Sequence, residues 1–394
     1  MPDDHIRNAA MRAGRYVAQP GGYRAFIPAP LPPDPPVRMD SEMWRLVSDA
    51  DRALGRLDGV TQTLPNPDLF LFMYVRKEAL LSSQIEGTQA SLLDVLEYEQ
   101  DIASAENPQD VEEVVNYIAA MNFGLRELEN VPISLRLIRS IHSKLLQGVR
   151  GDYKSPGEFR RSQNWIGPPG CTLVNAAFVP PPHHQVLEHL GLWEKFLHED
   201  LDMPALIKVG LAHAQFETIH PFLDGNGRLG RLLITFLLCE SKILRWPSLY
   251  ISYYFKKYKS EYYTRLQNTR DMGDWEGWLK FFLRGVKEVA AEATATASEI
   301  MHLRERNRAL IARDLGRAAA GSANILVERL YERPVITVQQ AANIIGSTYA
   351  NANNLIRRLT EVGLLQEMTG NRRNRRFAYT DYLSLFSDAP NARQ

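Results

Sequence analysis

The sequence of 394 residues has little cysteine, no net charge and no long apolar run. Its two cysteines, Cys171 and Cys239, lie far apart and outside any CxxC or Cys/His cluster, which argues against a disulfide framework and a zinc site and fits a reducing cytoplasm. The longest apolar run, 232–239, has eight residues, whereas a membrane-spanning helix needs about 20. No apolar segment follows the charged N-terminus, so a secretory signal is not expected. We therefore expect a cytoplasmic protein with no membrane contact.

The charges balance overall but not locally. The 46 basic residues match 46 acidic ones, which excludes a simple polycation that coats nucleic acid. Residues 81–130 hold eleven acids and one arginine, whereas residues 241–270 hold seven basic residues and one acid. Such blocks of opposite sign are able to dock on each other. A hydrophobic content of 45% is typical of a globular protein, and the length favours two or three domains.

Changes in pattern along the chain divide it into segments. Prolines crowd positions 28–36 and cannot sustain a helix or a central strand. Helical periodicity dominates afterwards, interrupted by a stretch rich in Gly, Pro and Asn that favours turns and a hairpin. The predicted segments are an extended Pro-rich arm at 1–40, an N-terminal helical region at 41–130, a catalytic core at 131–289, a linker helix at 290–320 and a winged helix-turn-helix at 321–394.

The C-terminal segment has the pattern of two short helices followed by a basic hairpin. Thr337 fits an N-cap and Gly346 a helix end, and a second helix is expected over 348–361. Four arginines lie on the hairpin, which suits a wing that contacts phosphates. Winged helices also dock on proteins, so binding to DNA and docking are both open for this segment.

The most informative stretch is 220–231, which reads HPFLDGNGRLGR. Pro221 biases His220 away from the α region, so the preceding helix is expected to end at His220. Gly225 and Gly227 are poor interior helix residues, so the next helix is expected to begin near Gly227. The stretch between them is a loop at a helix N-terminus, where unpaired backbone N–H groups bind phosphate and glycine lets the anion approach closely.

Charged side chains complete this candidate nucleotide site. Arg228 and Arg231 share one face of the first helical turn, where the helix dipole disfavours each cation by about 0.3–1 kcal/mol and a bound polyphosphate would reverse that penalty. Asp224 would be a poor neighbour of phosphate unless Mg²⁺ lay between them. Alone, Asp224 is more often a helix cap and His220 a hydrogen-bonded core histidine. Only the whole constellation indicates nucleotide-dependent group transfer.

The stretch resembles the signature of the Fic family, His-x-Phe-x-(Asp/Glu)-Gly-Asn-Gly-Arg-x-x-Arg, and matches its seven fixed identities and the acid. The similarity covers about residues 41–285 and the winged-helix tail. The resemblance implies a mostly α fold, in which a Fic-type helical bundle with a β-hairpin flap precedes a C-terminal winged helix-turn-helix.

The resemblance implies a protein adenylyltransferase that moves AMP from ATP to a Ser, Thr or Tyr hydroxyl of a protein, this chain included, and releases pyrophosphate. His220 would be the general base. Asp224 would hold a Mg²⁺ that bridges the α- and β-phosphates. The anion hole for these phosphates would be formed by Gly225, Asn226, Gly227 and Arg228. Arg231 would bind the γ-phosphate.

Two further parts of the site follow from the same resemblance. Residues 159–182 occupy the position of the flap, a hairpin that pairs with an extended target segment. Tyr262 and Tyr263 match positions that line the adenine pocket, with ordinary aromatic packing as the alternative. Some relatives have an Asn seven residues after the second Tyr, where this chain has Arg270, so the selectivity for the base is open.

An inhibitory motif of the family, (Ser/Thr)-x-x-x-Glu-(Gly/Asn), matches residues 82–87, SSQIEG. Ser82 and Glu86 are four apart on one helical face, and Gly87 fits a C′ residue. A carboxylate in a last helical turn needs a cationic partner, and Arg231 is the expected one. In relatives such a pairing occupies the arginine that holds the γ-phosphate. The alternative is an exposed glutamate at a frayed helix end.

Three classes of function remain open from the sequence. The leading prediction is an autoinhibited protein adenylyltransferase. Displacement of its inhibitory helix in a homo-oligomer is a further hypothesis. The second is transfer of another nucleotide, or removal of AMP, on the same scaffold. The third is a DNA-binding regulator whose core only senses nucleotide.

Overall fold

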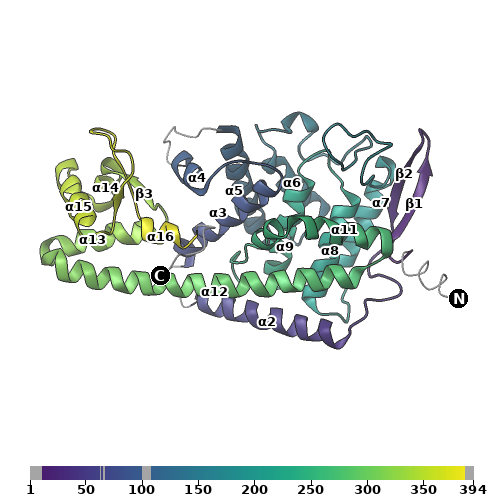
Figure 1. Ribbon diagram of the computed structural model, residues 1–394, viewed down its shortest axis with the longest axis horizontal. Coiled ribbons are helices and arrows are strands. Elements are labelled where there is room, and N and C mark those ends of the chain that lie inside the picture. The colour runs from purple at the N-terminus through teal and green to yellow at the C-terminus, as the bar shows by residue number, and fades with distance from the viewer. Residues whose placement is uncertain (1–10, 63, 65–66, 100–107, 387–394) are drawn as a thin grey trace.

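The computed structural model describes residues 11–386 except 63, 65–66 and 100–107. Figure 1 shows an elongated, mostly helical molecule with a hairpin at one end and a small mixed unit at the other. The outer ends of the predicted arm and of the predicted winged helix, 1–10 and 387–394, lie outside the described residues.

The N-terminal region corrects the expectation of an extended arm over 1–40. Strands β1 (Gly14–Gln19) and β2 (Tyr23–Pro28) form an antiparallel hairpin. The turn of this hairpin lies at residues 20–22, where Gly21 and Gly22 have φ values of 95° and 79° that favour glycine. The described proline-rich residues after β2 contain no helix or strand, as expected.

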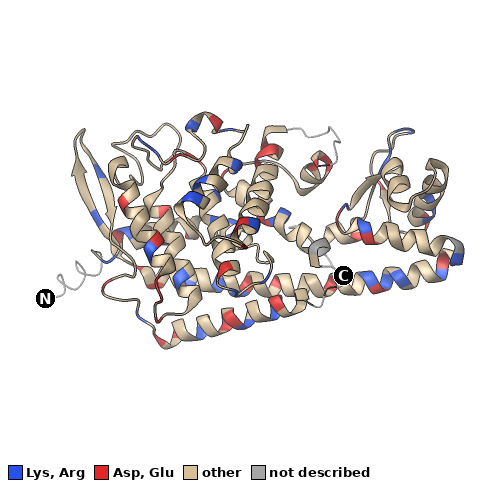
Figure 2. Cartoon of the chain, turned by 180° about the vertical axis from the view of Figure 1, so that it is seen from behind, with Lys and Arg blue, Asp and Glu red and all other residues tan. Residues whose placement is uncertain are grey.

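The longest element is helix α12 (Trp275–Asp314), which spans 40 residues and lies beside α2 (Ser41–Gln62) in Figure 1. Lys280 bridges Asp40 at 2.9 Å and Glu42 at 2.6 Å, and basic and acidic residues intermingle along both helices (Figure 2). The sequence between 275 and 314 has no proline, and α12 passes through 289/290 unbroken. The expected boundary between core and linker helix is therefore not a break in secondary structure.

The remaining helices form a body around α8 and α9. In α8 every residue from Leu206 to Ile219 except Lys208 is buried, and most of α9 is buried as well, so the two helices are enclosed on all sides. The helices of the body are α3 (Pro67–Ile85), α4 (Leu92–Tyr98), α5 (Pro108–Leu128), α6 (Leu135–Leu145), α7 (Val186–His198), α8 (Ala205–Ile219), α9 (Asn226–Glu240), α10 (Ser252–Lys257) and α11 (Lys259–Met272). Two short 3-10 helices, Asp152–Lys154 and His183–Gln185, lie in the connections.

The C-terminal unit has the expected element order. Thr337 makes a capping box at the start of α14, and Gly346 ends that helix in the left-handed region. The first strand after α15 begins at Gln366. The elements are α13 (Gly316–Leu330), β3 (Val335–Thr337), α14 (Val338–Ile345), α15 (Tyr349–Glu361), β4 (Gln366–Glu367), β5 (Arg376–Ala378) and α16 (Thr380–Ser384), with the sheet ordered β3-β5-β4. The winged-helix interpretation stays a prediction.

The two charge blocks meet at the end of α3 rather than as two facing surfaces. Lys256 and Lys259 of the basic block donate to the Oε1 of Gln84 at 2.7 Å and to the carbonyl of Ile85 at 2.5 Å. Cations at a helix C-terminus satisfy its free carbonyls and its dipole. Acids of the acidic block pair with arginines from other segments, as Glu99 does with Arg76 at 2.6 Å. Among the described residues, no helix is long and apolar enough to cross a membrane.

A buried carboxylate on α3 makes the stability of the fold depend on pH. Glu78 accepts hydrogen bonds from the backbone N–H of Ser252 at 3.0 Å and from the hydroxyls of Ser252 and Tyr117 at 2.5 and 3.2 Å. Burial raises the pKa of Glu78 to about 7.

We expect Glu78→Gln to flatten part of this pH dependence. Between its ordinary pKa of 4.5 and about 7, the unfolded chain releases the Glu78 proton while the folded chain keeps it. The wild type therefore loses stability relative to Glu78→Gln as the pH rises through this window, by at most about 1.4 kcal/mol per pH unit. Denaturant unfolding of both proteins from pH 4.5 to 7.5 measures the difference, and a constant difference would contradict a raised pKa.

Candidate functional site

The loop between α8 and α9 is held in shape by its own polar groups. His220 is the C-cap of α8 with φ 49°, and Gly225 is the N-cap of α9 with φ 75°. The side-chain amide of Asn226 accepts from the backbone N–H of Phe222 at 2.9 Å and donates to the carbonyl of Phe222 at 2.8 Å. The expected loop is thus present, and the side chain of Asn226 closes it, leaving only its backbone for an anion hole.

Three residues that the sequence analysis did not identify fasten the loop from outside. His142 on α6 accepts from the N–H of Gly157 at its Nδ1, so its Nε2 carries the proton and donates to the carbonyl of Asp224 at 2.9 Å. Buried Arg160 donates to the carbonyl of His220 at 2.9 Å. Asn164 donates to the carbonyl of Phe222 at 2.8 Å. All three act on backbone carbonyls, which leave no signal in a sequence.

The imidazole of His220 is neutral over the physiological pH range. Burial first, and then the positive charges of Arg160 and Arg270, lower the pKa of His220 to about 3. Its Nδ1 is buried without a hydrogen-bond partner in the described part of the chain, and the residue lines a cavity of about 290 Å³. His220 therefore presents an uncharged imidazole at that cavity.

The same cavity brings Asp224, Gly225, Gly227 and Arg228 together with Glu86. Asp224 Oδ2 contacts Lys154 Nζ at 3.0 Å, which together with Arg228 holds the pKa of that carboxyl below its usual value, although burial opposes them.

A magnesium ion fits the donors of this cavity only with ligands from a nucleotide. Asp224 supplies a carboxylate, and no group of three or more acidic, His or Cys side chains suited to a metal occurs in the described parts of the chain. Mg²⁺ commonly binds in proteins through one or two carboxylates plus phosphate oxygens and water. The single carboxylate of Asp224 at this cavity is in keeping with that mode of binding.

Arg231 and Glu86 form the expected ion pair. The Arg231 side chain is 1% exposed, and its Nη2 lies 2.7 Å from Glu86 Oε1. Its Nε donates to Ser82 Oγ at 2.8 Å and its Nη2 to the Ser82 carbonyl at 3.0 Å. A methyl group added at Gly227 would lie 2.3 Å from Glu86 Oε1, so the carboxylate sits directly over the first turn of α9. No side chain caps that turn.

The two tyrosines of the expected base pocket have different surroundings. Tyr262 is 1% exposed, stacks on Phe255 and shares a 3.0 Å hydrogen bond with His213, so it is part of the core. Tyr263 is 42% exposed and lines a second cavity of about 370 Å³ together with Arg270. For Tyr262 the alternative of ordinary aromatic packing describes its position better.

The flap region is less regular than expected. Residues 159–182 contain no strand, and their only β pairing is a single antiparallel bridge between Ile166 and Phe178. The segment is fastened by the N–H of Phe26 in β2, which donates to the carbonyl of Val179 at 2.9 Å. The β1–β2 hairpin therefore supports the flap region.

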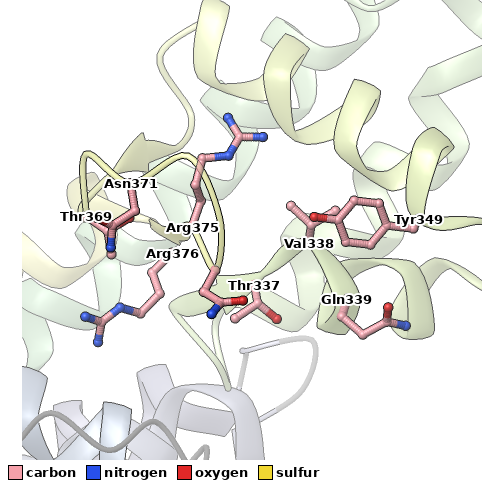
Figure 3. A pocket seen from close by; sticks show the side chains of 9 residues that line it. Thr337, Val338, Gln339, Tyr349, Thr369, Asn371, Arg375 and Arg376 are labelled. Carbon is pink, nitrogen blue, oxygen red and sulfur yellow. The ribbon is translucent and has the colours of Figure 1, made fainter.

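A third cavity, of about 420 Å³, lies in the C-terminal unit between the hairpin and the starts of α14 and α15. Figure 3 shows Arg375 and Arg376 diverging on one side and Tyr349 on the other. Arg375 donates to the Oδ1 of Asn353 at 2.6 Å, and Arg376 pairs with Glu97 of α4 at 2.7 Å. The C-terminal unit is therefore tied to the helix that follows the Glu86 segment.

The fold of this protein resembles that of solved structures. The protein has a mostly helical Fic-like fold with a small antiparallel hairpin and a small C-terminal sheet. The crystal structure of a Fic family protein from Desulfovibrio desulfuricans G20 superposes with a TM-score of 0.57 at 19% identity, covering 87% of this chain and 97% of that one. A Fic domain containing signaling protein from Bacteroides thetaiotaomicron superposes with a TM-score of 0.50 at 17% identity, covering 63% of this chain and 95% of that one.

Sequence comparison agrees with the fold. Residues 132–238 match the Fic/DOC family, and residues 44–126 match the Fic/DOC family N-terminal region. The chain is 27% identical over 175 residues to a probable protein adenylyltransferase of Aquifex aeolicus. The matched region covers 44% of this chain and 51% of that protein. It is 30% identical over 199 residues to the protein adenylyltransferase Fic of Aedes aegypti, covering 48% of this chain and 35% of that protein. The matches thus span about half or less of these distant relatives.

We expect Asn226→Ala to destabilise the fold by about 1–3 kcal/mol, because it leaves the buried N–H of Phe222 without a partner and its carbonyl with only the bond from Asn164. Denaturant unfolding gives the loss. The matched control is Asn130→Ala in an exposed turn, which should stay within about 0.5 kcal/mol of wild type. Equal effects of the two changes would show that the amide of Asn226 does not hold the loop.

Proposed function

We propose that the protein is an autoinhibited protein adenylyltransferase that transfers AMP from ATP to a hydroxyl of a target protein. The observation that carries this proposal is the position of Glu86. Its carboxylate lies over Gly227 at the start of α9 and against Arg231, which is where a terminal phosphate would bind. Distant relatives named as protein adenylyltransferases support the same chemistry.

The proposed reaction uses the residues of the loop. The attacking hydroxyl oxygen bonds to the α-phosphorus, the bond from the α-phosphorus to the departing pyrophosphate oxygen breaks, and the hydroxyl proton passes to the imidazole of His220. A neutral imidazole has a lone pair for this proton. The burial that lowers the pKa of His220 also weakens it as a base, so a negative charge of the bound substrate would have to stabilise its protonated form. The guanidinium of Arg228 and the N–H groups of the first turn of α9 would bind the phosphates.

The divalent cation belongs to the same proposal. Mg²⁺ would be held by Asp224 and phosphate oxygens and would neutralise phosphate charge. Lys154, at 3.0 Å from Asp224, neutralises that carboxylate in the described structure and would give way to the ion.

Inhibition would follow from competition for one guanidinium. A buried arginine needs an anionic partner, and Glu86 and the γ-phosphate are both suited to it. While Glu86 holds Arg231, a nucleotide would bind without its γ-phosphate ligand, and the α-phosphorus would be misaligned for attack. Ser82 accepts a hydrogen bond from the Nε of the same guanidinium, so two residues at the end of α3 and in the turn after it hold Arg231.

We expect Glu86→Gly to raise labelling of the protein or a target at least tenfold, because it frees Arg231 for the γ-phosphate. Incubation with ATP labelled at the α-phosphate and Mg²⁺, followed by mass spectrometry for an added AMP, measures the change. Adding His220→Ala to Glu86→Gly should remove the labelling, since His220 is the proposed base.

The matched control for this experiment is Glu129→Gly, which changes an exposed glutamate in a turn and should label like wild type. Equal labelling by wild type and Glu86→Gly would contradict the inhibition, and full labelling by the double variant would contradict the mechanism. Incubation of wild type with a target that already carries AMP tests the alternative of AMP removal, which would appear as loss of the label.

A DNA-binding regulator is the second candidate. The observation that favours it is the cavity of Figure 3, beside which Arg372 and Arg373 are exposed on the hairpin. Arg376 pairs with Glu97, which supports docking within the chain as the competing role.

If the hairpin binds DNA, binding of a fluorescent duplex should weaken steeply with salt, and Arg372→Glu with Arg373→Glu should reduce the log–log salt slope by about two. Fluorescence anisotropy over a salt series measures the slope. The matched control, Arg45→Glu with Arg56→Glu on α2, makes the same charge change at exposed sites away from the hairpin. No binding by wild type, or equal loss in both double variants, would favour docking.

A further inference from the structure

The second cavity, which Tyr263 and Arg270 line, has polar groups suited to hydrogen-bonding the edge of a flat heterocycle. It is lined by the flap residues Ile166 and Phe178 on one side and by Glu217, Tyr263 and Arg270 on the other. The following inference rests on the proposed nucleotidyl transfer, because it takes this cavity as the place of the nucleobase.

Arg270 is held rigidly with donors to spare. Its Nε donates to Thr218 Oγ1 at 3.2 Å, its Nη2 to the carbonyl of Glu217 at 3.2 Å and its Nη1 to Gln267 Oε1 at 3.3 Å. A guanidinium has five N–H donors, so these three bonds leave one N–H on each terminal nitrogen. The guanidinium also lies 3.8 Å from the centre of the Phe178 ring, which fixes its plane.

The amide that could read adenine is occupied. Gln267 lines the same cavity, but its Nε2 donates to the hydroxyl of Tyr16 at 3.1 Å and to Asp271 at 3.0 Å, while its Oε1 accepts from Arg270. A free amide would match the N6 and N7 edge of adenine, one group donating and one accepting. Here both of its groups face protein partners.

Glu217 supplies an acceptor next to these donors. It is 6% exposed and lines the cavity. Its Oε1 is buried against Gly230 of α9 and has no hydrogen-bond partner in the described structure, so a ligand in the cavity would meet the other part of the carboxyl group. Burial raises the pKa of Glu217 to about 7, and the charges of Arg231 and Arg270 oppose that rise. A buried carboxyl without a partner is costly, so a ligand with N–H donors would stabilise it.

Guanine has the complementary edges. Its O6 and N7 are adjacent acceptors for two N–H groups of one guanidinium, whereas its N1–H and N2–H₂ are donors for a carboxylate. Adenine would place the donor N6–H₂ where the guanidinium also donates. The pair of one arginine and one glutamate therefore distinguishes the two purines.

We propose that Arg270 and Glu217 read guanine in this cavity, so that GTP serves as a nucleotidyl donor beside ATP. The transfer has the same balance as with ATP: the target hydroxyl oxygen bonds to the α-phosphorus of GTP, pyrophosphate leaves, the proton passes to His220, and the target gains GMP.

Binding is tested on Glu86→Gly/His220→Ala, the variant proposed to bind nucleotides without transfer. Calorimetric Kd values for ATP and GTP with Mg²⁺ give a GTP:ATP preference. We expect this preference to fall about tenfold or more when Arg270→Asn is added, because one bidentate contact is lost. Glu217→Gln, which keeps the shape of the side chain, should lower it independently. Arg265→Asn is the matched control on α11, where Arg265 pairs with Glu261 at the surface, and should leave the preference unchanged.

Transfer is tested in parallel with Glu86→Gly and each labelled nucleotide. GMP labelling that depends on Arg270 supports the proposal. A preference that neither Arg270→Asn nor Glu217→Gln alters, or binding of ATP alone, overturns it. If Kd preferences depend on Arg270 but no nucleotide is transferred by Glu86→Gly, the reading of the base stands and the proposed adenylyltransferase function fails.

Discussion

The ion pair between Arg231 and Glu86 is the contact on which the arrangement of the site depends. Arg231 is enclosed in the core, and a buried guanidinium without an anion would cost several kcal/mol. It lies one turn inside α9, where the helix dipole adds to the demand for negative charge. Glu86, in the turn that follows α3, meets that demand, so the end of α3 and the start of α9 are linked through one side chain.

Further contacts connect this region of the molecule to its two ends. The last turn of α3 is fastened by Lys256 and Lys259 beyond α9, and α4, which follows Glu86, is tied to the C-terminal unit through Glu97 and Arg376. At the opposite end, the β1–β2 hairpin supports the flap region that walls the second cavity.

The fold class and the loop were predictable because both rest on local rules. A proline after His220 and glycines at 225 and 227 predict a helix, a loop and a second helix, and the structure has all three. The contacts that hold the loop were not predictable, since His142 and Arg160 bond to backbone carbonyls and any residue supplies a carbonyl. The hairpin at 14–28 was missed because its turn is rich in the residues that also mark irregular chain.

The sequence by itself determined a mostly helical chain with a phosphate loop, a paired set of arginines and one glutamate four residues after a serine, because spacing along a helix decides which side chains share a face. Only the tertiary structure decided which partners they meet. It buried Tyr262 and left Tyr263 at a cavity, turned the amide of Asn226 back onto its own loop and brought Arg270 beside Glu217. Those outcomes depend on packing between segments far apart in the chain, and periodicity carries no information about distance between helices.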